Sequence, residues 1–290
     1  PDGDFRLDDV PAETERIGVV PDVSMIHLHT NAARRAIADA GIEMSEIDGV
    51  ATAGPSAIEL ADMLGIRPRW ADGTMIGGCS FMALVRHACA AIASGAANVV
   101  LVTHGESGRS GVGRANNVRP ATSMGGQFEA PYGALAPYAS FTTPVLAFMK
   151  SRGFTREDLA EVVVSQRLWA MPNERAQRRD PIDVEGVLSA RPIAYPFTRD
   201  MCCVVTDAGG ALVLMSAERA RDLPGGDRAV YILGSGEGTE SVIVSQMDDL
   251  ESFGPFRRGA KEAFETAGVT HDDMGHAMFY DAFAHLPLYM

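Results

Sequence analysis

A cysteine behind two glycines is the first candidate for chemistry in this sequence. Gly77-Gly78-Cys79-Ser80-Phe81 precedes an alanine-rich stretch with helical spacing. A thiol at a helix N-terminus feels the positive end of the helix dipole, which favours the nucleophilic thiolate. Free backbone N–H groups at the same place can stabilise an oxyanion. Cys79 is therefore a candidate nucleophile, and the alternative is a small residue buried under a tight glycine turn.

A tyrosine followed by an aspartate forms the second candidate. Tyr280 and Asp281 follow the apolar stretch Ala277–Phe279, which predicts a strand. In α/β sheets, ligands gather beyond the carboxyl ends of strands. A tyrosine hydroxyl can donate or accept a proton, and a carboxylate can orient a neighbouring group. The pair is a candidate acid/base site, and the alternative is an edge tyrosine with a solvated hydroxyl.

The elements that must position these residues alternate between helix and strand. Helices are predicted over Ser24–Ala40 and Phe81–Ser94, each followed directly by a glycine. Continuous apolar or β-branched runs are typical of strands buried on both faces, as in a parallel sheet. Strands are predicted over Gly73–Ile76, Asn98–Thr103, Ala211–Met215 and Ala229–Leu233. This order predicts a layered α/β fold.

The stretch between Gly105 and Pro196 departs from that alternation. It is rich in Gly, Pro, Asn and Arg, and it predicts two helices, Pro144–Ser151 and Thr155–Trp169. An insertion of this length in a compact fold usually has a role, such as covering a site. The alternative is a structural cap or a dimer contact.

The sequence also repeats itself. Ala33–Ile42 resembles Ala260–Val269, 227 positions further along, and each copy continues without a gap through a turn into an apolar stretch. We interpret this as an internal duplication. The predicted organisation is an N-terminal half over 1–217, including the insertion at about 105–196, and the beginning of a second half over 218–290. We expect that second half to be C-terminally incomplete.

Composition excludes several classes of protein. The 290 residues are 46% hydrophobic, and 25 basic against 38 acidic side chains give a net charge of −13, which disfavours nucleic-acid binding. No apolar run reaches the roughly 20 residues of a membrane span. The four cysteines contain no C-x-x-C pair and are too few for a disulfide scaffold. We expect a reduced, cytoplasmic protein without a metal site or a secretory signal.

Several segments together resemble the thiolase superfamily, in its lipid-transfer or sterol-carrier thiolase-like branch. They are Ile76–Ser94, Val99–Val102, the Gly105-Glu106 step, Thr206–Gly210 and Tyr280–Phe283. The resemblance extends over nearly the whole chain. It implies a duplicated βαβαβαββ layered fold, a cap-like loop domain in the first half, and a homodimer.

Two positions depart from the degradative thiolases. A register anchored on Val85-Arg86 places Gly78, not Cys79, at the nucleophile position. One step along a helix start turns a side chain by about 100°. Tyr280 stands where thiolases carry the Asn or His of the oxyanion hole. Both departures are similar to the steroid side-chain-cleaving aldolases of this branch, which lack the cysteine nucleophile.

That resemblance implies retro-aldol cleavage of a β-hydroxyacyl-CoA, which releases a short acyl-CoA. Tyr280 would act as an acid/base group with Asp281 beside it, no cofactor would be bound, and coenzyme A would be part of the substrate. It also implies a partner protein with a DUF35-type OB-fold and a zinc ribbon. Two alternatives stay open: a thiolase (acetyl-CoA C-acyltransferase) that uses Cys79, and a non-catalytic lipid-binding or scaffold subunit.

Overall fold

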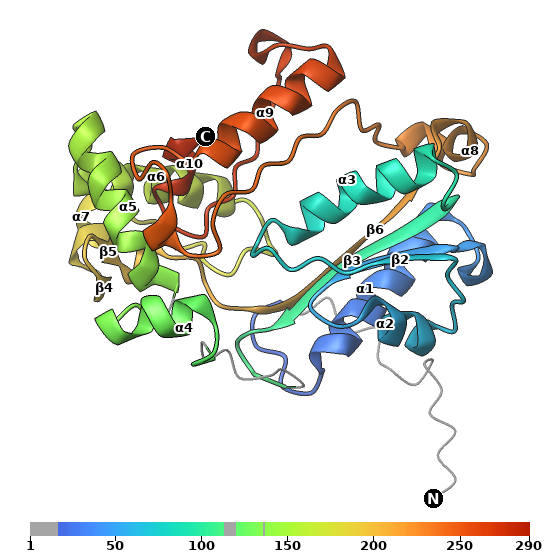
Figure 1. The fold of residues 1–290 in the computed structure, drawn as a ribbon, viewed down its shortest axis with the longest axis horizontal. Coiled ribbons are helices and arrows are strands. Elements are labelled where there is room, and N and C mark those ends of the chain that lie inside the picture. Colours follow the sequence, from blue (N-terminus) through green and yellow to red (C-terminus); the bar gives the residue numbers. More distant parts are fainter. Residues whose placement is uncertain (1–16, 113–119, 136) are drawn as a thin grey trace, which may run out of the picture. The chain divides into compact units, whose positions relative to one another are not determined.

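The structure is a computed structural model that describes residues 17–112, 120–135 and 137–290. The chain forms two compact units, each built from two stretches of sequence (Figure 1). The sheet unit comprises Pro1–Asn116 and Val205–Tyr231, and the helical unit comprises Asn117–Val204 and Ile232–Met290. These units group residues by contact, whereas the predicted halves group them by duplication, so the boundary near residue 217 stays a prediction.

The sheet unit is organised around a four-stranded sheet in the order β2-β1-β3-β6. Its strands are β1 (Gly49–Ala53), β2 (Trp70–Asp72), β3 (Val99–Ser107) and β6 (Asp207–Met215). β1 runs parallel to both β2 and β3, as predicted. β6 runs antiparallel to β3 along its whole length, so the sheet is mixed. An apolar run indicates burial of a strand but not its direction, which explains why the sequence did not reveal this.

Helices cover both faces of this sheet. α1 (Met25–Ala40) and α2 (Ala57–Leu64) pack on one face, and α3 (Ser80–Ala93) packs on the other (Figure 1). Successive side chains of a strand point to opposite faces. In β3, Val99 and Leu101 therefore join the core under α1 and α2, while Val100 and Val102 join the core under α3. The predicted layered α/β fold is confirmed.

The helical unit has a core of its own. Its helices are α4 (Met124–Phe128), α5 (Pro137–Arg152), α6 (Arg156–Ala170), α7 (Val184–Ser189), α9 (Gly254–Ala267) and α10 (Leu286–Tyr289). The hairpin β4 (Pro192–Ala194) and β5 (Phe197–Thr198) completes it. Side chains such as Val145, Leu159 and Phe197 pack against Phe283 and Leu286, so the end of the chain closes this core.

Short elements connect these helices and strands. They are α8 (Ala217–Arg221) and the 3₁₀ helices η2 (Met44–Glu46), η3 (Ala130–Tyr132), η4 (Arg199–Met201), η5 (Gly226–Arg228), η6 (Val244–Gln246) and η7 (His271–Asp273). Both helices predicted in the insertion are present, within α5 and α6. No helix among the described residues is long and apolar enough to cross a membrane.

The strand predicted over Gly73–Ile76 is wrong. The edge strand is β2, which ends at Asp72. The Asp72 carboxylate accepts a hydrogen bond from the backbone N–H of Gly73 at 2.7 Å, so that donor turns away from the ladder. The chain then leaves the sheet and turns at Gly77, whose φ is 93°.

The strands predicted over Ala229–Leu233 and Ala277–Phe279 are also absent from the described structure. Both stretches lack a ladder partner among the described residues, and their apolar side chains face solvent: Val230 is 92% exposed and Met278 is 88% exposed. A strand exists only where a neighbour supplies the hydrogen bonds. The apolar pattern was present, but the described residues contain no strand beside it.

The predicted duplication is visible in local geometry. α1 is followed by Gly41 (φ 67°, ψ 32°) and α9 by Gly268 (φ 68°, ψ 29°), the same left-handed C-cap. A 3₁₀ helix with a capping box then begins in each copy, at Met44 and at His271, again 227 positions apart. The match ends at the next element. The first copy enters β1, whereas the second copy enters a stretch that has no strand partner among the described residues.

Candidate functional site

Cys79 is the N-cap residue of α3 and is exposed to solvent. Its thiol lies over its own turn, with Sγ 4.0 Å from the carbonyl oxygen of Ile76. The turn is held by buried Ser80, whose hydroxyl donates to Gly77 O at 2.6 Å and accepts from Ile76 N–H at 2.8 Å. The alternative of a residue buried under the glycine turn is therefore wrong for Cys79, and Ser80 fills that role.

Tyr280 lies at the end of the exposed stretch after η7, and its side chain is 46% exposed. The chain is anchored just beyond it. Ala282 O accepts a hydrogen bond from Cys203 N–H at 2.9 Å, and Ala284 N–H donates to Met201 O at 3.0 Å. These bonds form part of an antiparallel bridge between residues 202 and 283. Tyr280 therefore lies where this exposed stretch joins the core of the helical unit.

Asp281 has a specific side-chain partner. The Gln166 side chain on α6 donates from Nε2 to Asp281 Oδ2 at 2.7 Å. The residue as a whole is exposed, but its carboxyl group lies against neighbouring atoms, and this loss of hydration raises the pKa of Asp281. Burial, followed by the negative charge of Asp281, raises the pKa of the nearby Cys203 thiol. The thiol therefore stays protonated at neutral pH, which disfavours a role for Cys203 as a nucleophile.

The same face of α6 makes a second contact with the stretch that carries Tyr280. The ring of Trp169 meets the ring of His276 edge-on, with centroids 6.3 Å apart and planes at 80°. Residues three apart on a helix share a face, so Gln166 and Trp169 contact the same stretch at its two ends. Sequence spacing gave no signal for either contact, because each joins residues more than a hundred positions apart.

Two fully buried histidines accompany the candidate residues, one in each unit. In the sheet unit, His29 on α1 has Nδ1 2.8 Å from Thr103 Oγ1 and Nε2 3.0 Å from Gly105 O. A carbonyl oxygen only accepts, so Nε2 carries the hydrogen and Nδ1 is an acceptor. The Thr103 hydroxyl donates to Thr52 Oγ1 at 3.0 Å, so the Thr52 hydroxyl, 3.1 Å from Nδ1, donates to the ring. Burial lowers the pKa of His29 to about 4. A side chain at Gly105 would meet the imidazole ring at 2.7 Å, which explains the glycine there.

In the helical unit, His285 is also fully buried, and it is packed among aromatic rings. The ring centroids of Phe141, Phe197 and Tyr289 lie 5.7, 5.5 and 5.3 Å from its own. Neither ring nitrogen has a hydrogen-bond partner among the described residues. Burial lowers the pKa of His285 to about 4, so the ring is neutral at neutral pH.

The Thr206–Gly210 motif has a structural role through Asp207. Its buried carboxylate accepts hydrogen bonds from the backbone N–H groups of Val20 (2.8 Å), Arg109 (2.8 Å) and Ser110 (3.0 Å). Desolvation alone would raise the pKa of Asp207, but these N–H donors outweigh it and hold the pKa below its usual value. Asp207 therefore ties three segments of the sheet unit together.

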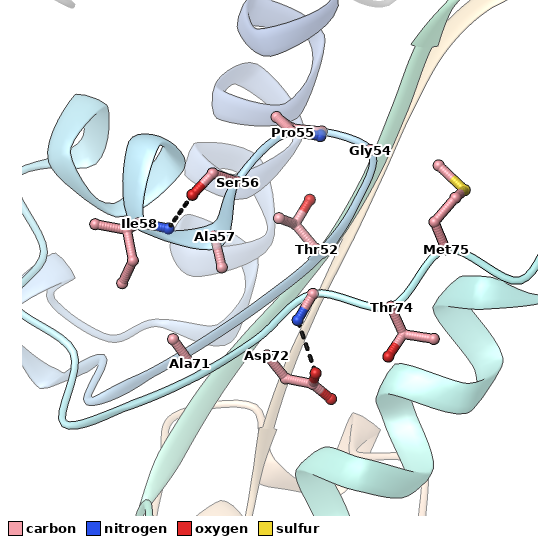
Figure 2. Close-up of a pocket in the computed structure, with 11 residues that line it drawn as sticks. Thr52, Gly54, Pro55, Ser56, Ala57, Ile58, Ala71, Asp72, Thr74 and Met75 are labelled. Atoms are coloured by element: carbon pink, nitrogen blue, oxygen red, sulfur yellow. Dashed lines mark hydrogen bonds between the residues drawn. The ribbon is translucent and has the colours of Figure 1, made fainter. Parts of the chain in front are cut away.

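A cavity of about 420 Å³ opens in the sheet unit beside the carboxyl ends of β1 and β2 (Figure 2). Two of the polar side chains that line it already have hydrogen-bond partners. Ser56 caps α2 through Ile58 N–H at 3.3 Å, and Asp72 binds Gly73 N–H and the Nδ1 of His87 at 2.6 Å. The lining includes none of the predicted site residues. The described residues also contain no cluster of His, Cys, Asp and Glu that could hold a metal ion.

The chain is similar to several known proteins in sequence and in structure. Residues 236–290 match the family described as thiolase C-terminal domain-like. A steroid side-chain-cleaving aldolase of Thermomonospora curvata is 31% identical over 91% of this chain and 71% of its own length. The 17-hydroxy-3-oxo-4-pregnene-20-carboxyl-CoA lyase of Mycobacterium tuberculosis is 30% identical over 90% and 71%. The solved Ltp2-ChsH2(DUF35) aldolase superposes with a TM-score of 0.83 at 29% identity, over 93% of this chain and 73% of that chain.

These likenesses, with the layered fold and the repeated helix–glycine–3₁₀ unit, define a thiolase-like α/β protein. The chain belongs to the thiolase superfamily, in its sterol-carrier thiolase-like branch. It is a carbon–carbon lyase of that superfamily. The predicted family, fold class and enzyme class are confirmed.

Proposed function

We propose that this protein cleaves a β-hydroxyacyl-CoA by a retro-aldol reaction and releases a short acyl-CoA. The observation that carries the proposal is the pair of departures from the thiolase pattern. Gly78 takes the nucleophile position, and Tyr280 takes the position of the oxyanion-hole Asn or His. The likeness to two relatives named as a side-chain-cleaving aldolase and a CoA lyase supports the same chemistry.

The reaction requires proton transfer but no acyl-enzyme. A base removes the proton of the β-hydroxyl group, the Cα–Cβ bond breaks, and a carbonyl group forms at Cβ. The bonding electron pair passes into the thioester as an enolate, which takes a proton at Cα to give the shorter acyl-CoA. Tyr280 is the proposed acid/base group for these transfers. Asp281 is its proposed neighbour that fixes the local orientation.

The proposed substrate carries a steroid or a similarly bulky apolar group on Cβ. The support is the printed substrate of the Mycobacterium tuberculosis relative, a pregnene carboxyl-CoA. Coenzyme A enters as part of the substrate. The proposed partner is a DUF35 protein, because a similar solved structure is an Ltp2-ChsH2(DUF35) aldolase. The OB-fold and zinc proposed for that partner, and the homodimer proposed for this chain, follow from the family resemblance alone.

One experiment separates this function from the thiolase alternative, which the exposed position of Cys79 at the start of α3 favours. Release of short acyl-CoA is followed by chromatography with a steroid β-hydroxyacyl-CoA and the DUF35 partner present. Tyr280→Phe is expected to lower kcat by about 10²-fold or more, because general acid/base catalysis contributes factors of this size. Cys79→Ser is expected to retain the wild-type rate.

The opposite pattern would support the thiolase. Loss of turnover in Cys79→Ser, with a full rate in Tyr280→Phe, would assign the chemistry to a thiolate. Selective modification of Cys79 by iodoacetamide with loss of turnover would do the same. Cys89→Ser is the matched control, because Cys89 lies in the middle of α3, packs against the core, and has a thiol whose pKa is raised by burial.

A further inference from the structure

The stretch that carries Tyr280 is exposed and, after η7, has no helix or strand in the described part of the chain. Residues 271–281 are all exposed, and those between η7 and the bridge at 283 form no strand among the described residues. Geometry within a few tenths of an ångström matters for proton transfer, and a misplacement of about 1 Å can lower a rate about 10²-fold. Something outside this stretch must therefore fix the position of its end.

α6 makes that contact through a charged hydrogen bond. Gln166 is half-buried on α6, and its amide donates to the Asp281 carboxylate at 2.7 Å. Hydrogen bonds to an ionised acceptor are short and stronger than neutral ones. α6 is itself fixed, because Leu159 and Ala160 on this helix are fully buried in the core of the helical unit. The bond therefore links a rigid helix to the residue that follows Tyr280.

We propose that Gln166 is a positioning residue for the reaction, acting through Asp281 to hold Tyr280 in place. The inference rests on the proposed function of Tyr280. The edge-on contact of Trp169 with His276 holds the other end of the same stretch to the same helix face. The backbone bonds at Ala282 and Ala284 hold the chain beyond it. Tyr280 thus lies between the ring contact at His276 and the backbone bonds at Ala282 and Ala284. Among the hydrogen bonds that the structure describes, the one from Gln166 reaches the side chain of Asp281, directly next to Tyr280.

Two replacements of Gln166 test the bond itself. Gln166→Leu has a similar size but cannot donate, and kcat is expected to fall about 10-fold or more with little change in KM, since the substrate is bound but misaligned. Gln166→Glu can donate to Asp281 only when one of the two carboxyl groups is protonated. Its activity is therefore expected to recover toward acidic pH, whereas that of Gln166→Leu is not.

A double-mutant cycle and a control complete the experiment. If Gln166 acts through Asp281, Gln166→Leu combined with Asp281→Asn should be no slower than Asp281→Asn alone. Ser165→Ala, at an exposed neighbouring position on α6, should retain the wild-type kcat and pH profile. Each variant is assayed with the steroid β-hydroxyacyl-CoA and the DUF35 partner, after circular dichroism confirms that it is folded.

The outcomes distinguish this inference from the proposed function. If Tyr280→Phe is inactive but the Gln166 variants keep the wild-type kcat and pH profile, the positioning role of Gln166 is overturned and the proposed function is not. Multiplicative losses in the cycle, or a Gln166→Glu enzyme without acidic recovery, would also overturn it. A fully active Tyr280→Phe would overturn the role of the tyrosine and, with it, this inference.

Discussion

His285 is expected to make the helical unit sensitive to mild acid. Its ring is fully buried, its nitrogens have no partner among the described residues, and burial lowers its pKa from 6.5 to about 4. In the unfolded chain the same group would titrate near 6.5. Because the folded-state pKa is the lower one, the unfolded state binds the proton first. The free energy of unfolding is therefore not reduced by His285 above pH 6.5. It falls as the pH drops from 6.5 toward 4, because protons then bind the unfolded chain in preference.

The size of the effect follows from the shift. One pKa unit corresponds to about 1.4 kcal/mol, so the helical unit is expected to lose about 1.4 kcal/mol at pH 5.5 and about 3 kcal/mol by pH 4 through this residue. His285→Phe removes the titration. At pH 7.5 it should be neutral or stabilising, because an unpartnered buried polar group costs about 1–3 kcal/mol and a fourth phenylalanine suits the surrounding rings.

Urea unfolding measured by tryptophan fluorescence tests this. The sequence has two tryptophans, so a Trp70→Phe background leaves Trp169 in the helical unit as the probe. The difference in unfolding free energy between His285→Phe and its parent is measured at pH 7.5, 5.5 and 4. His271→Asn, at an exposed position of the same unit, is the control for the removal of a histidine. A difference that stays constant across the three pH values would refute the reasoning.

Two further replacements test contacts of the fold. Gly236→Ala would place a methyl group against the carbonyl oxygen of Gly259 in α9, so we expect the free energy of unfolding in urea to fall by about 3 kcal/mol. Gly275→Ala has open space around the added methyl group and should leave the free energy of unfolding unchanged. Asp207→Asn turns an amide N–H₂ toward backbone donors, so the unfolding free energy of the sheet unit should fall by about 2–3 kcal/mol. The same urea titration measures this loss with Trp70 as the probe. Asp227→Asn, at an exposed position, is the control and should change the unfolding free energy little.

The sequence predicted elements whose signals are local. The helix over Ser24–Ala40 and the left-handed glycine after it were confirmed because spacing and a missing Cβ are properties of adjacent residues. The repeat predicted a matching helix before Gly268 and a turn after it for the same reason, and the structure shows that this turn is a 3₁₀ helix. The family resemblance rested on such local motifs too, which explains why it was confirmed.

What the sequence missed depends on neighbours far along the chain. Apolar runs at Ala229–Leu233 and Ala277–Phe279 predicted strands, but a ladder needs a second strand and the described residues offer none there. The antiparallel direction of β6 is likewise set by its partner. The bond from Gln166 to Asp281 spans 115 positions, so no spacing rule could find it. Residue type indicated candidate site residues, whose roles stay predictions, and the contacts that orient them could not be predicted from the sequence.

The glycines at 234, 236 and 238 have a consequence for how the chain finds its place. All three face the backbone of α9, against Ala263, Gly259 and Pro255. A slip of the extended segment by one residue would drive Ser235 and Glu237 into the helix, since alternate side chains point the same way. A slip by two would bring Ile232 or Glu240 into the place of one glycine. The absence of side chains at these three sites therefore specifies a single alignment of segment and helix.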